Sequence, residues 1–201
     1  MNRKMRTHQA LLQARNLIEY ENSSALPHIT EALQKIEHEI LNEVGTVIRE
    51  AVREDAFYDI LEAAGHDDMG PFDGACLLVG IALHDCLKQR SLDARLQYTY
   101  GYNKTDPMAT RIGGHVFVAV GGLLLDGDGV QTQEQAIQHW QDTELFITQE
   151  FVSILADARE AFLLDLPEDH IASACNHEVF YDRQVAFALS HYFAEKINAA
   201  P

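Results

Sequence analysis

Two apolar runs separated by a pair of glycines constrain the fold more than any other part of the chain. The runs are residues 115–120 (His-Val-Phe-Val-Ala-Val) and 123–126 (Leu-Leu-Leu-Asp), with Gly121-Gly122 between them. Both turn residues can adopt positive φ, as the tightest turns between antiparallel strands require. The segment therefore predicts a β-hairpin, and with it an antiparallel sheet.

This hairpin brings acidic side chains to the face that carries His115. Counting back from the turn, Phe117 lies opposite Asp126 and His115 lies opposite Asp128. Side chains alternate faces with period two, so both acids share the histidine's face, Asp128 directly across and Asp126 on the diagonal. A register shift of one residue would move them to the other face. The alternative is an ordinary hairpin whose Asp-Gly-Asp-Gly end is a loop or an acidic turn.

A cysteine lies at the start of a second apolar segment. Residues 70–74 have the composition of a turn, and an apolar run extends from Leu77 to Leu87. Asp73 suits the N-cap position, which places Cys76 in the first turn of a buried helix. There the helix dipole favours a thiolate, and the amide of Cys76 can donate to an oxyanion. Free cysteines are also often simply buried, so a structural role is the alternative.

In chain order, the thiol, the histidine and the acids are the parts of a thiol nucleophile. The thiolate attacks, the imidazole takes its proton, and a carboxylate orients the imidazole. Cys76 is the candidate nucleophile and His115 the candidate base, with Asp126 or Asp128 as the orienting acid.

The same stretches resemble a known group of enzymes. Gly74-x-Cys76 opening an apolar helix, then His-Val-Phe-Val-Ala-Val, then Leu-Asp-Gly-Asp-Gly, is similar to the core of papain-like cysteine enzymes in their transglutaminase-like branch. Arylamine N-acetyltransferases share the Cys, His, Asp order. The continuation over residues 129–140 resembles small uncharacterised bacterial and phage proteins of this type. The resemblance covers about residues 70–140 and implies Asp126, at the end of its strand, as the orienting acid.

The resemblance implies a cysteine hydrolase or acyltransferase that acts on an amide as a peptidase, a deamidase or a transglutaminase-like enzyme. A thioester would form on the cysteine and be resolved by water or an amine, with no cofactor. The substrate would be a protein or peptide amide. Two departures favour an alternative, a catalytically inactive papain-like module that binds proteins. No glutamine stands a few residues before Cys76, where papain-like peptidases keep an oxyanion donor, and no aromatic residue follows Cys76.

Length and hydrophobic patterning predict one α+β domain over residues 1–201, because 201 residues that are 47% hydrophobic can bury a sizeable core. We divide it into a helical segment (1–65), a catalytic core (66–152) and C-terminal helices (153–201). In the core, the helix that bears Cys76 packs on a small antiparallel sheet. Besides that helix and the hairpin, we expect helices at 3–20, 28–53, 55–64, 133–141, 153–164 and 179–197, and strands at 94–100 and 144–152.

The charge balance narrows the classes of partner. The chain has 15 Lys and Arg against 31 Asp and Glu, a net charge of −16. Such a surface repels phosphate backbones and anionic lipid, so we expect neither nucleic-acid nor membrane binding. It would suit a basic protein substrate, although a solubilising surface is the simpler interpretation. The sequence leaves the oligomeric state open.

Cysteine and histidine usage argues against disulfides and metal. Three widely spaced cysteines and no secretory signal indicate a reducing compartment, so we expect the cytoplasm, or delivery by a secretion route that needs no signal. Two clusters, His84-Asp85-Cys86 and Cys175-Asn176-His177, lack the paired spacing of zinc sites, so we expect no metal. His84 lies about 80° around the helix from Cys76, a poor position for its base.

Overall fold

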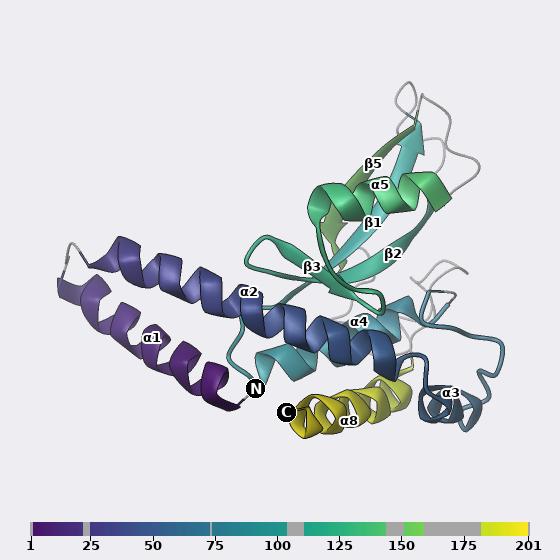
Figure 1. The fold of residues 1–201 in the computed structure, drawn as a ribbon. Coiled ribbons are helices and arrows are strands. Elements are labelled where there is room, and N and C mark those ends of the chain that lie inside the picture. Colours follow the sequence, from purple (N-terminus) through teal and green to yellow (C-terminus); the bar gives the residue numbers. More distant parts are fainter. Residues whose placement is uncertain are drawn as a thin grey trace.

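The computed structural model describes residues 2–21, 25–72, 74–103, 111–143, 151–158 and 182–200. Within them the fold is α+β, with helices gathered below and beside one sheet (Figure 1). In chain order the elements are α1 (Asn2–Glu21), α2 (Leu26–Ala51), α3 (Asp55–Glu62), α4 (Cys76–Lys88), β1 (Arg95–Asn103), β2 (Arg111–Val120), β3 (Leu123–Asp126), β4 (Gly129–Thr132), α5 (Gln133–Thr143), β5 (Phe151–Asp157) and α8 (Arg183–Ala199).

The sheet is antiparallel, five strands wide, and ordered β4-β3-β2-β1-β5. The predicted hairpin is confirmed, because Val120 pairs with Leu123 across Gly121 and Gly122. Both glycines have positive φ, +56° and +85°, as a two-residue turn between twisted strands requires. The turn therefore fixes the register of β2 against β3, on which the position of His115 depends.

Two strands differ from the sequence-based expectation. Residues 129–132 form β4, which the sequence did not suggest, and it pairs with β3 through a second tight turn. Residues 151–157 form β5, so the helix expected at 153–164 is wrong at its start. That segment pairs with residues 97–103 of β1 instead, and its Phe, Val and Ile side chains suit a strand. The rest of that expected helix and most of the strand expected at 144–152 fall outside the described residues.

Helix α4 lies at the centre of the core. Ten of its residues are buried, and it packs against α8 and against the face of β2 that carries Val116. Gly80 makes this close approach possible, because a Cβ there would lie 2.7 Å from Cγ1 of Val116. Alternate residues of β2 point to the other face, where Phe117 packs with Leu124 and with Ala136 of α5. The sheet thus separates a large core under α4 from a small one under α5.

The long helix α2 runs beside the core, and α1 lies alongside it (Figure 1). The apolar stripe of α2 packs on the core, with Val44 and Ile48 fully buried. Near its C-terminal end α2 meets β4 so closely that a Cβ on Gly45 would lie 2.8 Å from Cγ2 of Val130. This contact anchors the β3–β4 turn. No helix in the described part of the chain is long and apolar enough to cross a membrane.

Candidate thiol site

Cys76 is the first residue of α4, in the first helical turn as the sequence predicts. Its side chain is 4% exposed. Ala75 precedes it at the N-cap position and has no side-chain group that could bond the first amides. Since the first amides of a helix have no acceptor within the helix, the N–H of Cys76 is open to an outside acceptor. The expectation that Asp73 is the N-cap is therefore wrong, because Ala75 holds that position; Asp73 itself lies outside the described residues.

His115 and Asp126 form a direct hydrogen bond. Nε2 of the imidazole lies 3.0 Å from Oδ2 of the carboxylate, and the Asp126 side chain is 6% exposed. The contact is the predicted diagonal one. Val118 pairs with Leu125, so the next residues along, Phe117 and Asp126, face one another and His115 lies two residues farther on the same face. The buried carboxylate therefore holds one ring nitrogen of the histidine.

Two further donors fix the Asp126 carboxylate. The backbone N–H of Asp128 donates to Oδ1 at 2.9 Å. The side-chain amide of Gln131 donates from Nε2 to Oδ2 at 3.2 Å. Gln131 was not predicted from the sequence, because it lies on β4, the strand that was not expected. Recognising Gly127-Asp128 as a second turn would have placed Gln131 on the same face as Asp126.

Asp128, the alternative acid, points elsewhere. Its carboxylate is 3.6 Å from Nη2 of Arg53, which follows α2, and its carbonyl accepts from Nε of Arg49 on α2 at 2.6 Å. The expected pairing of Asp128 with His115 is wrong, because β3 ends at Asp126 and the chain turns there into β4. Of the two acids, only Asp126 bonds to the imidazole.

The third partner of His115 is Cys76. Burial lowers the pKa of the imidazole, but the hydrogen bonds with Asp126 and Cys76, and attraction to the charges of both, outweigh it and raise the pKa to about 9. The ring is therefore protonated at neutral pH. Since Nε2 faces Asp126, Nδ1 is the nitrogen left to exchange a proton with the thiol. The three side chains lie in the order that a thiol nucleophile requires.

Aromatic rings flank the imidazole. Phe117 meets it edge-on with ring centroids 4.7 Å apart, and Phe72 lies 5.9 Å away on the turn before Cys76. Phe72 also covers Gly127, where a Cβ would lie 3.0 Å from Cζ of the ring. Phe117 is buried, whereas Phe72 is 47% exposed. One ring thus restricts the histidine from within the core and the other borders it at the surface.

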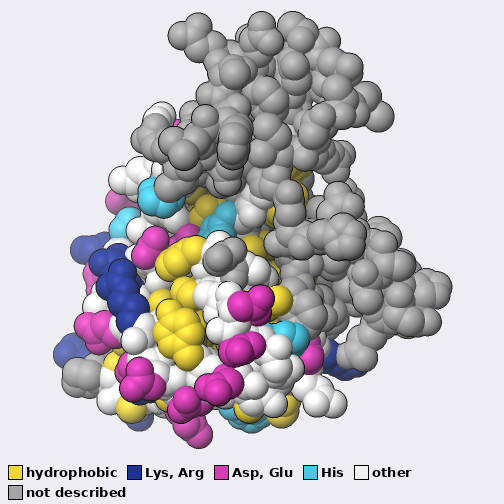
Figure 2. Space-filling view, turned by 90° about the vertical axis from the view of Figure 1, so that its right-hand side faces the viewer, with side chains coloured by type: hydrophobic (Ala, Val, Ile, Leu, Met, Phe, Trp, Pro, Cys, Tyr) yellow, Lys and Arg dark blue, Asp and Glu magenta, His cyan; other side chains and the backbone are white. Residues whose placement is uncertain are grey.

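Acidic side chains lie on the side of the molecule that α3 occupies. Figure 2 shows them in magenta on the lower part of this face, with hydrophobic side chains in yellow beside them. The exposed acids of α3 and of the turn that follows it are Asp55, Asp59, Glu62, Asp67 and Asp68. They place part of the net charge on the segment that leads to Cys76.

The second described cysteine differs from Cys76. Cys86 is fully buried, its Sγ lies 3.2 Å from the carbonyl oxygen of Ser190, and burial raises the pKa of its thiol. Its neighbour His84 contacts Asp85, at 3.1 Å. Among the described residues, no group of three or more histidines, cysteines and acids could hold a metal ion. The other cluster considered from the sequence, at 175–177, lies outside them.

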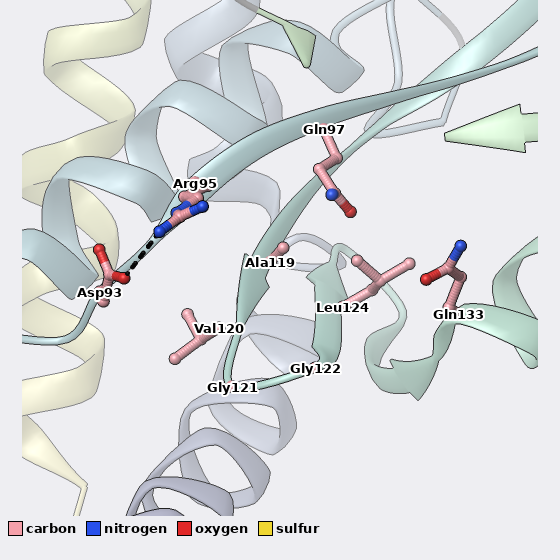
Figure 3. A pocket seen from close by; sticks show the side chains of 9 residues that line it. All are labelled: Asp93, Arg95, Gln97, Ala119, Val120, Gly121, Gly122, Leu124 and Gln133. Carbon is pink, nitrogen blue, oxygen red and sulfur yellow. Dashed lines mark hydrogen bonds and ion pairs between the residues drawn. The ribbon is translucent and has the colours of Figure 1, made fainter. Parts of the chain in front are cut away.

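A cavity of about 300 Å³ opens near the β2–β3 turn (Figure 3). In it the Arg95 guanidinium is ion-paired with Asp93 at 3.3 Å. Its lining consists of Asp93, Arg95, Gln97, Ala119, Val120, Gly121, Gly122, Leu124 and Gln133. None of the three residues of the thiol site contributes to it, so the cavity is separate from that site.

No protein-family model, no curated protein and no solved structure matches the chain. The resemblance to papain-like enzymes therefore depends on the quoted sequence stretches alone.

Proposed function

We propose that this protein is a cysteine-dependent hydrolase or acyltransferase that acts on an amide bond. One observation carries the proposal: a largely buried imidazole bonded to a buried carboxylate through Nε2 and also hydrogen-bonded to a thiol at the start of a helix. A cysteine with a purely structural role needs neither the imidazole nor the carboxylate. A papain-like or transglutaminase-like core is the arrangement we infer, supported by the Cys, His, Asp order and by the helix packed on an antiparallel sheet.

In the proposed reaction the Cys76 thiolate attacks the amide carbon and forms a C–S bond, and the carbonyl electrons move to oxygen. The N–H of Cys76 donates to this oxyanion. As the C–N bond breaks, protonated His115 gives its Nδ1 proton to the leaving amine. Neutral His115 then takes a proton from water or from a second amine, which attacks the thioester and releases the thiolate. Asp126 keeps the Nε2 proton in place throughout, so that Nδ1 alone exchanges.

The proposed substrate is a protein or peptide amide. A basic one suits the acidic surface, and the cytoplasm is the compartment we expect. A second function, protein binding by a catalytically silent module, is favoured by the low exposure of Cys76, which is 4%.

An acyl donor tests the proposed chemistry directly. We expect p-nitrophenyl acetate to acetylate Cys76 and release nitrophenolate, with the adduct located by mass spectrometry of peptides. Cys76→Ala and His115→Gln should abolish the adduct, whereas Cys86→Ala should leave it unchanged. An adduct of equal yield in His115→Gln, or none on Cys76 in the wild type, would contradict the enzyme proposal and favour the binding module.

A further inference from the structure

We propose that Gln131 is a positioning residue of this site, and that its amide holds the Asp126 carboxylate where it meets His115. The inference rests on the proposed function, because an oriented imidazole matters most for a reaction that exchanges its proton. The sequence predicted no role for Gln131, and it lies outside the three residues that carry the proposed chemistry.

Both oxygens of the Asp126 carboxylate accept hydrogen bonds. Oδ2 accepts from Nε2 of Gln131 at 3.2 Å and from Nε2 of His115 at 3.0 Å. Oδ1 accepts from the backbone N–H of Asp128 at 2.9 Å. With donors on both oxygens, the carboxylate cannot turn about its own axis without breaking a bond. Gln131 is the only side chain besides His115 that bonds this carboxylate among the described residues.

The sheet brings Gln131 to this place. It pairs with Leu124, while Gly129 pairs with Asp126, so Gln131 lies on the diagonal from Asp126 across β3 and β4. Diagonal neighbours share a face and are within reach of long side chains. The β3–β4 turn that sets this pairing is held to α2 by Arg49, through the carbonyl of Asp128. The amide therefore reaches Asp126 from a fixed strand.

Removing this donor should weaken the interaction between Asp126 and His115. The carboxylate is buried, and a buried charge depends on its hydrogen bonds. Without Gln131, Oδ2 keeps only the imidazole and Oδ1 only the Asp128 amide, so one fewer hydrogen bond opposes rotation of the carboxylate away from the ring. The proton on Nε2 is then held less firmly, and the titration midpoint of His115 should fall. The neutral ring should also change from one tautomer toward a mixture of two.

Titration of His115 by NMR tests this in the intact protein. Gln131→Met keeps the length of the side chain and removes the amide. We expect the His115 midpoint to fall by at least about one pH unit, which is a tenfold change in proton affinity. Asp126→Asn should lower it further. The control Gln133→Met, at an exposed position two residues along the chain, should leave it unchanged. Circular dichroism establishes that each variant folds.

A second variant covers the case in which Gln131→Met does not fold. Gln131→Asn keeps a polar amide but shortens the side chain by one methylene, so the hydrogen bond is lost, and the same fall is expected. An unchanged or higher midpoint in the folded variant, with Asp126→Asn lowering it, would overturn the role of Gln131. A Cys76 that fails to accept an acyl group would contradict the proposed function only, because the titration judges Gln131 independently.

Discussion

The proton on His115 should make the stability of this protein depend on pH. Burial lowers the pKa of this imidazole, but its bonds with Asp126 and Cys76 raise it from 6.5 to about 9 in the folded chain. A raised pKa means that the folded state binds the proton more tightly than the unfolded state does. The resulting stability is present in full below about pH 6.5, declines above it, and is lost once the pH passes about 9.

The magnitude follows from the two pKa values. A difference of roughly 2.5 pH units, at about 1.4 kcal/mol per unit, corresponds to about 3–4 kcal/mol. For a chain of this kind that is a substantial share of the total free energy of unfolding, which is typically about 5–15 kcal/mol. Because Cys76 also contributes to the raised pKa of the imidazole, the same measurement on Cys76→Ala separates the part that comes from the carboxylate.

Urea unfolding between about pH 6 and pH 10 measures the contribution of the His115 proton to the free energy of unfolding. The wild type should lose about 3–4 kcal/mol more stability over this range than His115→Gln does. His38→Gln, which removes an exposed histidine of α2, should follow the wild-type curve. Parallel curves for wild type and His115→Gln would refute the reasoning, because they would mean that the folded protein does not hold the His115 proton tightly.

Two further predictions follow from the packing around the site. Asp126→Asn should lower acetylation of Cys76 by at least about tenfold, since the orienting carboxylate is lost, whereas Asp128→Asn should change it little because the Asp128 carboxylate pairs with Arg53. Labelling yields mapped to Cys76 compare the two variants, and a larger loss in Asp128→Asn would reverse the assignment. Gly80→Ala should destabilise the folded chain by about 1–3 kcal/mol, because its Cβ would lie 2.7 Å from Cγ1 of Val116 and push α4 away from β2. Urea unfolding measures this loss. An unchanged urea midpoint would mean that α4 can move away from β2 without cost.

Local patterns predicted the parts of the site that depend on nearby residues. The Gly121-Gly122 turn sets the register of β2 against β3, so the diagonal contact of His115 with Asp126 followed from counting residues. The turn before Cys76 and the apolar run after it placed the thiol at a helix start. Both inferences use contacts between residues close in sequence or across one short turn.

The remaining features depend on contacts that the sequence does not display. Counting past Asp126 failed because β3 ends there, and the chain takes a second turn in which Gly129 has a φ of +105°. Residues 151–157 pair with β1 about fifty residues earlier. Such a distant pairing decides where a strand forms, and it leaves no local pattern in the sequence. Gln131 was missed for the same reason, because its role exists only once β4 is paired.

Alkylation of the native protein tests the central claim most directly. Iodoacetamide is applied near neutral pH to wild type and His115→Gln, and peptide mapping by mass spectrometry follows each cysteine. We predict that Cys76 is modified far faster than Cys86, because only Cys76 has a helix N-terminus and an imidazole partner, and that His115→Gln removes the difference. Equal labelling of the two thiols, or labelling of Cys76 only after unfolding, would contradict an activated nucleophile at this site.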